Sequence, residues 1–355
     1  MHGSVRGALG DQCPYRDLRG VPQGGTVTGN ERMHAVLSGK QPDDAVPIWE
    51  LGFYCMDAAS GRHLVQGREF EALSPAGRER ALEENADIVA AVAEKYDFAA
   101  VSTLGGYWEI APGTPAYYWL PADYRLRQAS ILRKRLGRNR MMVGSCGGVM
   151  AIPGAGEYEE FCVTLLEEPE RLEERAERTL EQGLEGAKEL RDAGCDAVYT
   201  ASDMADNRGP FFRPEQMRRL ILPYLAKWAR AVKGMGLHAI LHTDGNLHPI
   251  MDELCDSGVE AVQAVDPVAG MDIVLAKRQA RGRVALAGNI DCGLLVRGPE
   301  EKVYAEVRRV LEACKPGGGF ILGASNTIYR ETPIRHYDAM HRAWKEHGTY
   351  ARRPS

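Results

Sequence analysis

The stretch "HAILHTDGNLHPIMDELCDSGVEAVQAVD", residues 238–266, decides the predicted fold. It begins with an apolar run at 238–244 and ends with a second apolar run at 261–266. The residues between these runs, roughly 247–257, have the pattern of a short helix. A strand, a helix and a strand in this order form the unit from which parallel sheets are built. The stretch therefore predicts one repeat of an α/β fold.

The same alternation continues along most of the chain. Six further apolar runs lie at 46–52, 98–103, 141–146, 197–203, 284–291 and 319–325. Amphipathic helical patterns separate them, the clearest at 167–194, 213–236, 271–280 and 299–313. Eight strands alternating with helices predict a single-domain α/β fold, a (β/α)₈ TIM barrel. A doubly wound open sheet is the alternative, although no GxGxxG motif follows the first strand to support a dinucleotide-binding version.

Composition limits the remaining choices. The net charge of −5 gives no basic footprint for nucleic acid, and no run of 18 apolar residues predicts a membrane span. Eight cysteines without a CxxC pair are typical of reduced thiols, so we expect a cytoplasmic protein. Residues 1–29 show no periodicity and no signal-peptide core, and are expected to be a flexible leader. The barrel is expected over 30–350, with Asn30 capping its first helix.

In such a barrel the chemistry lies where strands end and loops begin. The predicted strand ends carry an unusual number of polar residues, namely Glu50, Thr103, Cys146, Asp203, His242, Asp244, Asp266, Asn289, Asp291 and Asn326. Charged groups at buried strand ends cost free energy unless they are paired, coordinated or used. The sequence therefore predicts a functional site at this end of the barrel.

His242 and Asp244 are the strongest candidates. They are two residues apart, so both side chains point to the same face of a strand. An imidazole and a carboxylate can hold a divalent metal, or can act as an acid and a base. Glu50 is the third predicted catalytic residue and a further metal ligand. The structural alternatives are a hydrogen bond between His242 and Asp244, and a helix cap or arginine pair for Glu50.

Six other residues are predicted to bind substrate: Asp203, Asn326, Tyr107, Trp108, Asn289 and Asp291. Asp203 precedes a Gly-Pro loop, a common place for binding residues. Tyr107 and Trp108 are predicted to form an aromatic wall or, alternatively, a core anchor. Asn289 and Asp291, in "GNID", can equally shape the turn. The Cys146 thiol is either a nucleophile with a nearby base or a buried structural group.

Residues 30–350 resemble the uroporphyrinogen decarboxylase superfamily. The resemblance rests on four segments: "NERMHAVLSGKQPDDAVPIWE" (30–50), "LHTDGNLHPIMDELCDSGVEAVQ" (241–263), "LAGNIDCGLLVRGPEEKV" (286–303) and "LGASNTIYRETPIRHYDAMHRA" (322–343). It implies a (β/α)₈ barrel and an enzyme. The superfamily contains both decarboxylases and corrinoid-linked methyltransferases, which differ in their pocket residues.

The decarboxylase pattern is not met at the pocket positions. In the decarboxylases, two arginines bind the substrate carboxylates, and the resemblance places Gly52 and Met56 at these positions. It places Thr103 where the decarboxylases have an aspartate. It places Ile152 near a pocket tyrosine and Ala324 on a late histidine. A substrate with eight carboxylates requires a cationic pocket. Decarboxylation of uroporphyrinogen or of a smaller acid is therefore kept as the alternative function.

The methyltransferase branch implies a zinc site made of an HxC pair and a distant cysteine. Here His242 matches the histidine, while Asp244 and Asn326 match the cysteines. The resemblance thus implies a nitrogen and oxygen site, with Glu50 as a further donor and zinc as the first choice of divalent metal. Its expected partners are a small-molecule substrate, a corrinoid on a separate carrier protein and, in a homodimer, a second copy of the chain. A non-catalytic ligand-binding barrel is the second alternative.

Overall fold

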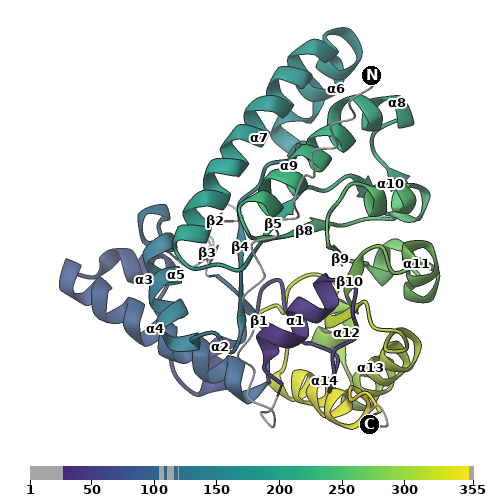
Figure 1. The fold of residues 1–355 in the computed structure, drawn as a ribbon. Helices are drawn as coiled ribbons and strands as arrows, with labels where there is room; N and C mark the ends of the chain where they lie inside the picture. The colour runs from purple at the N-terminus through teal and green to yellow at the C-terminus, as the bar shows by residue number, and fades with distance from the viewer. Residues whose placement is uncertain (1–26, 104–107, 110–115, 119, 352–355) are drawn as a thin grey trace, which may run out of the picture.

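The computed structural model describes residues 27–103, 108–109, 116–118 and 120–351. Its centre is a sheet of seven parallel strands surrounded by helices (Figure 1). In spatial order the strands are β1 (Ala100–Ser102), β4 (Met141–Ser145), β5 (Ala197–Ala201), β8 (His238–Thr243), β9 (Ala261–Ala264), β10 (Ala285–Ile290) and β11 (Phe320–Ala324). Each strand lies inside a predicted apolar run. The predicted α/β class is therefore confirmed.

The predicted first strand, 46–52, takes a different form. Ile48 makes isolated parallel bridges to Phe98, just before β1, and to Leu322 in β11. The Ala99 N–H donates to the Ile48 carbonyl (2.8 Å), and the Trp49 N–H donates to the Leu322 carbonyl (3.0 Å). The segment thus lies between the two edges of the seven-stranded sheet. Seven of the eight predicted strands are confirmed, in a TIM-barrel-like fold.

The helices lie around the sheet in chain order. They are α1 (Gly29–Leu37), α2 (Met56–Ser60), α3 (Gly67–Ala72), α4 (Pro75–Lys95), α5 (Ala122–Leu136), α6 (Tyr158–Glu167), α7 (Pro169–Asp192), α8 (Pro214–Gln216), α9 (Leu222–Gly234), α10 (Met251–Asp256), α11 (Ile273–Ala280), α12 (Cys292–Arg297), α13 (Glu300–Cys314) and α14 (Ile334–His347). Two short hairpins are also present, β2 (Trp108–Glu109) with β3 (Ala116–Tyr118) and β6 (Ala205–Asp206) with β7 (Gly209–Pro210). Short 3-10 helices lie at Ala155–Glu157, His248–Ile250 and Pro267–Ala269. No helix in the described ranges is long and apolar enough to cross a membrane.

Two helical predictions are refined by the structure. The pattern at 213–236 is interrupted by a π-helical turn over Met217–Ile221, which ends two residues before Pro223. The proline has no N–H to continue the α-helical ladder, and the Leu222 N–H donates five residues back to Met217. The predicted N-cap Asn30 is wrong, because Thr28 caps α1 by a reciprocal capping box with Glu31.

Alternating side chains on the strands build two packing layers. One layer, on the inner face of the curled sheet, includes Trp49, Ile240 and Ile321. The other, between strands and helices, includes Ala239 and Leu241. Because side chains alternate along β8, the side chain of residue 242 lies on the same face as Ile240. The sheet thus directs the end of β8 toward the interior of the fold.

Candidate functional site

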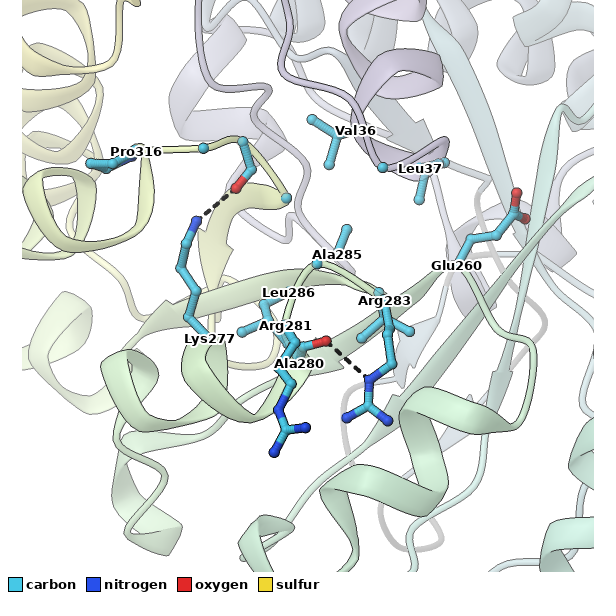
Figure 2. Close-up of a pocket in the computed structure, with 16 residues that line it drawn as sticks. Val36, Leu37, Glu260, Lys277, Ala280, Arg281, Arg283, Ala285, Leu286 and Pro316 are labelled. Carbon is cyan, nitrogen blue, oxygen red and sulfur yellow. Dashed lines mark hydrogen bonds between the residues drawn. The ribbon is translucent and has the colours of Figure 1, made fainter.

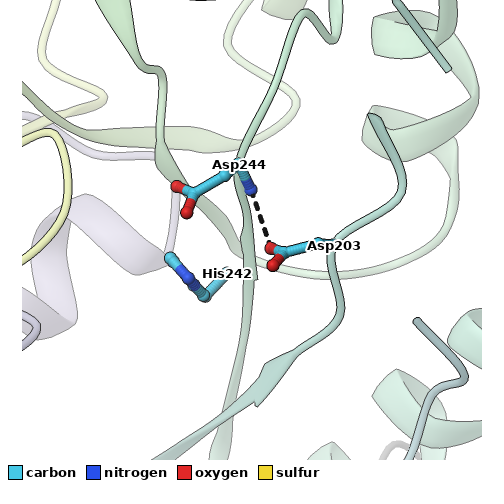
Figure 3. Close-up of side chains that lie close together, drawn as sticks. All are labelled: Asp203, His242 and Asp244. Carbon is cyan, nitrogen blue, oxygen red and sulfur yellow. Dashed lines mark hydrogen bonds between the residues drawn. The ribbon is translucent and has the colours of Figure 1, made fainter. Parts of the chain in front are cut away.

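Three side chains meet at the carboxyl ends of β5 and β8. Asp203, His242 and Asp244 each offer one ligand atom, and these atoms lie within 4.8 Å of one another (Figure 3). The Asp244 N–H donates to Asp203 Oδ1 at 3.0 Å, which ties the two loops together. In the part of the chain that the structure describes, no other three His, Cys, Asp or Glu side chains meet this criterion. The sequence-predicted pair is therefore joined by Asp203, which was predicted only to bind substrate.

The imidazole of His242 is buried and held from two sides. Its Nδ1 lies 2.5 Å from Gln263 Oε1 in β9, and its ring packs edge-on against Tyr199 with centroids 6.4 Å apart. Only 7% of the residue is exposed. Sequence reasoning missed Gln263, although a polar residue inside the apolar run "AVQAVD" was a usable signal.

Asp244 has an incomplete set of hydrogen bonds. Its Oδ2 accepts from Asn326 Nδ2 at 2.8 Å, while its Oδ1 is buried without a hydrogen-bond partner among the described residues. Burial, with the carboxylates of Asp203 and Asp266 adding to it, raises the pKa of Asp244 to about 6, against the opposing effects of His242 and Asn326. A buried acceptor without a donor costs about 1–3 kcal/mol. The unpaired oxygen, the imidazole and the second carboxylate together fit a bound divalent cation.

Glu50 is not brought into this cluster. Its Oε2 accepts from the Ala324 N–H and its Oε1 from the Tyr337 hydroxyl of α14, both at 2.9 Å. Tyr337 belongs to the layer between the sheet and the helices, so the carboxyl group faces α14. Burial raises the pKa of Glu50 to about 8, against the two hydrogen bonds that lower it. The structure thus gives Glu50 partners of its own, away from His242 and Asp244.

The asparagine and aspartate of "GNID" have different surroundings. Asn289 Nδ2 donates to the Val265 carbonyl at 2.5 Å, and its buried Oδ1 has no partner in the described ranges. Asp291 is the N-cap of α12 and accepts from the Gly293 N–H at 2.7 Å. Asp291 therefore has the turn-shaping contact that was its alternative interpretation, while Asn289 keeps a free acceptor.

The remaining predictions concern two aromatic residues and a thiol. Tyr107 lies outside the described residues. Trp108 is part of β2, and its side chain also lies outside what is described. Burial raises the pKa of the Cys146 thiol to about 12, so the thiol is neutral at ordinary pH and a poor nucleophile.

A separate pocket of about 280 Å³ opens at the opposite end of the sheet, beside the starts of β10 and β11 (Figure 2). Two of its lining cations, Lys277 and Arg283, already have hydrogen-bond partners. Lys277 Nζ donates to the carbonyls of Cys314 and Gly318, and Arg283 Nε donates to the Ala280 carbonyl at 3.3 Å. Residues at this end of a TIM-type barrel usually serve stability. The candidate site is therefore the Asp203–His242–Asp244 cluster.

This protein is therefore of the TIM-barrel-like class, with its candidate site at the carboxyl ends of the strands. The family model described as "Uroporphyrinogen decarboxylase (URO-D)" matches residues 120–347, and the chain belongs to this family. The resemblance noted in the sequence is therefore confirmed at the level of the family.

Two curated relatives and one solved structure are similar to this chain. The chain is 28% identical over 207 residues to a uroporphyrinogen decarboxylase from Xanthomonas axonopodis pv. citri, covering 55% of this chain and 56% of the relative. It is 26% identical over 236 residues to one from Anaeromyxobacter dehalogenans, covering 62% and 64%. It thus spans less than two thirds of these relatives. A methyltransferase from Methanosarcina mazei has a similar fold, with a TM-score of 0.67, 22% identity and coverage of 90% of this chain and 99% of that one.

Proposed function

We propose that this protein is a methyltransferase of the uroporphyrinogen decarboxylase family. It moves a methyl group between a small molecule and a corrinoid held by a separate carrier protein. The observation that carries the proposal is the Asp203–His242–Asp244 cluster, with its unpaired buried carboxylate oxygen. The fold of the Methanosarcina mazei methyltransferase supports the same class of chemistry.

In this proposal, His242, Asp203 and Asp244 would hold a divalent metal, with zinc as the first choice. When bound, such a metal would supply Lewis acidity to the heteroatom that gives or receives the methyl group. Two carboxylates offset the charge of the ion, and Asn326 holds Asp244 in position through its amide N–H. Without a metal, Asp244 serves as a general base, because a pKa of about 6 suits proton transfer near neutral pH.

Decarboxylation of uroporphyrinogen is the second candidate, favoured by the names of the relatives. Its substrate carries eight carboxylates. Here burial, and then repulsion from the nearby carboxylates of Asp203 and Asp266, raises the pKa of Asp244. Met56, at a position that the resemblance assigns to an arginine, is buried in the core. The acidic character of the site therefore supports methyl transfer over this alternative. A non-catalytic binding barrel is the third candidate.

The test is turnover. Protein purified without chelator is analysed for metal and incubated with methylcobalamin and a panel of oxygen, nitrogen and sulfur acceptors. The proposal expects demethylation of the corrinoid, which is measured by the change in its absorbance. The rate of this reaction should fall by about 10²–10⁴-fold in His242→Ala. Stoichiometric release of carbon dioxide from uroporphyrinogen would establish the second candidate instead. Ligand binding without turnover of either substrate would leave the non-catalytic barrel.

A further inference from the structure

We infer that Gln263 is a positioning residue that fixes His242 in one tautomer, with the proton on Nδ1 and the Nε2 lone pair directed to the site. The inference rests on the proposed role of His242. It starts from one contact, the 2.5 Å approach of His242 Nδ1 to Gln263 Oε1. Both residues are buried, Gln263 to the extent that 2% of it is exposed. Bulk water therefore competes little for this hydrogen bond.

The orientation of the Gln263 amide follows from its second contact. Its NH₂ group lies 3.5 Å from the carbonyl oxygen of Ala324 in β11. A carbonyl oxygen can only accept, so the NH₂ group must face Ala324 and the amide oxygen must face His242. Turning the amide over would place two acceptors against each other at Ala324. The two contacts thus determine which end of the amide meets the imidazole.

The tautomer of His242 follows in turn. Because Gln263 Oε1 can only accept, His242 Nδ1 must carry the proton in this hydrogen bond. In the neutral imidazole the other nitrogen, Nε2, then has a free lone pair. Asp203 and Asp244 lie near the same imidazole, and a metal or a proton at this cluster needs that lone pair. A partner on the second nitrogen is the usual way in which proteins orient a histidine ligand.

The support for Gln263 extends across the sheet. Ala324, which receives the Gln263 amide, is itself held by Glu50, whose carboxyl oxygen accepts from the Ala324 N–H at 2.9 Å. Glu50 is anchored by Tyr337. A sequence-predicted catalytic residue thus connects to His242 through a chain of buried contacts without touching the cluster.

The experiment is ¹⁵N NMR of the histidine side chains in the full-length protein, at a pH at which the imidazole is neutral. The His242→Asn spectrum assigns the signal. Wild type should show His242 with a protonated Nδ1 and an unprotonated Nε2. Gln263→Leu, which keeps the bulk and removes the acceptor, should give a mixture of tautomers. Gln263→Glu, which restores an acceptor, should return the Nδ1–H form.

The second readout is metal affinity, measured by titration with Zn²⁺ and Mn²⁺. Gln263→Leu should bind about 10–100-fold more weakly than wild type, as for other residues that orient metal ligands. The matched control is Gln128→Leu on α5, which also removes a buried amide that donates to a backbone carbonyl, that of Leu82. It should leave both the tautomer and the affinity unchanged.

The outcomes separate this inference from the proposed function. An Nε2–H tautomer in wild type, or an unchanged spectrum in a folded Gln263→Leu variant, overturns the inference whatever the activity. Equal losses of affinity in the Gln263 and Gln128 variants also overturn it, because they indicate a general loss of packing. Wild-type protein that binds no metal and transfers no methyl group, yet shows the expected tautomers, refutes the proposed function and leaves the positioning role intact.

Discussion

Replacing Glu50 by glutamine should change the pH dependence of stability in a defined way. Glu50 is buried, with 4% of the residue exposed, and its two oxygens accept from the Ala324 N–H and the Tyr337 hydroxyl. Burial raises its pKa from 4.5 to about 8, although both hydrogen bonds act to lower it. Glutamine has the same shape as the protonated side chain and cannot ionise. Glu50→Gln therefore isolates the cost of ionising this group.

The sign follows from proton linkage. Between pH 4.5 and about 8 the unfolded chain loses the Glu50 proton while the folded protein keeps it. The folded state then binds more protons, so its stability falls as the pH rises. The contribution of Glu50 to the free energy of unfolding is fully present below pH 4.5 and is lost progressively up to about pH 8. Above that pH the free energy of unfolding no longer changes through this group. At 1.36 kcal/mol per pH unit, the change is on the order of 5 kcal/mol.

The assay is urea unfolding of wild type and Glu50→Gln at intervals from pH 5 to pH 9. The variant should gain stability relative to wild type as the pH rises, and the difference should level off near pH 8. Glu253→Gln, at an exposed position on α10, is the control for a surface glutamate. A difference between Glu50→Gln and wild type that stays constant over this range would falsify the argument from burial.

Three further predictions concern the site and its neighbourhood. Because a proton on Asp244 competes with a metal, Zn²⁺ affinity should fall as the pH drops through about 6. Calorimetric titrations showing no pH dependence would exclude Asp244 as a ligand. Asn326→Leu removes the N–H that stabilises the Asp244 carboxylate. It should therefore weaken Zn²⁺ binding by about tenfold or more and move the pH dependence of binding to higher pH, whereas unchanged titrations would contradict this role of Asn326. Iodoacetamide should label Cys146 far more slowly in native protein at pH 7.5 than in urea, because burial raises its pKa to about 12; equal rates by mass spectrometry would argue against that burial.

Most strands could be predicted from the sequence, because a buried parallel strand is a short apolar run between helical patterns. The first run failed as a regular strand for a local reason. The backbone N–H of Trp49 donates to the Leu322 carbonyl of β11. The next residue of this segment that faces β11 in the N-terminal direction is Pro47, which has no N–H to donate. The apolar pattern located the segment correctly, but backbone donors determine how far a ladder extends.

The site was predicted where only local spacing was needed. His242 and Asp244 meet because residues two apart on a strand share a face. Asp203 joined them because β5 pairs with β8, a neighbourhood that depends on strand order. Glu50 was grouped with them by proximity to a strand end alone, and the structure gives its carboxyl group other partners. Trp49 faces the inner layer, so the adjacent Glu50 faces α14, and "VPIWELG" is too apolar throughout to reveal which residues point inward.

The ligand chemistry narrows the proposed reaction further. A thiol substrate is activated by a soft, sulfur-rich zinc centre, whereas this cluster offers one imidazole nitrogen and carboxylate oxygens. Cys292 interacts electrostatically with Asp266. Its thiol stays neutral because burial raises its pKa to about 11. Carboxylates favour harder ions and harder substrate atoms. If the proposed transfer occurs, oxygen or nitrogen acceptors should therefore outperform thiols in the methylcobalamin assay, and a preference for thiols would contradict this assignment of ligands.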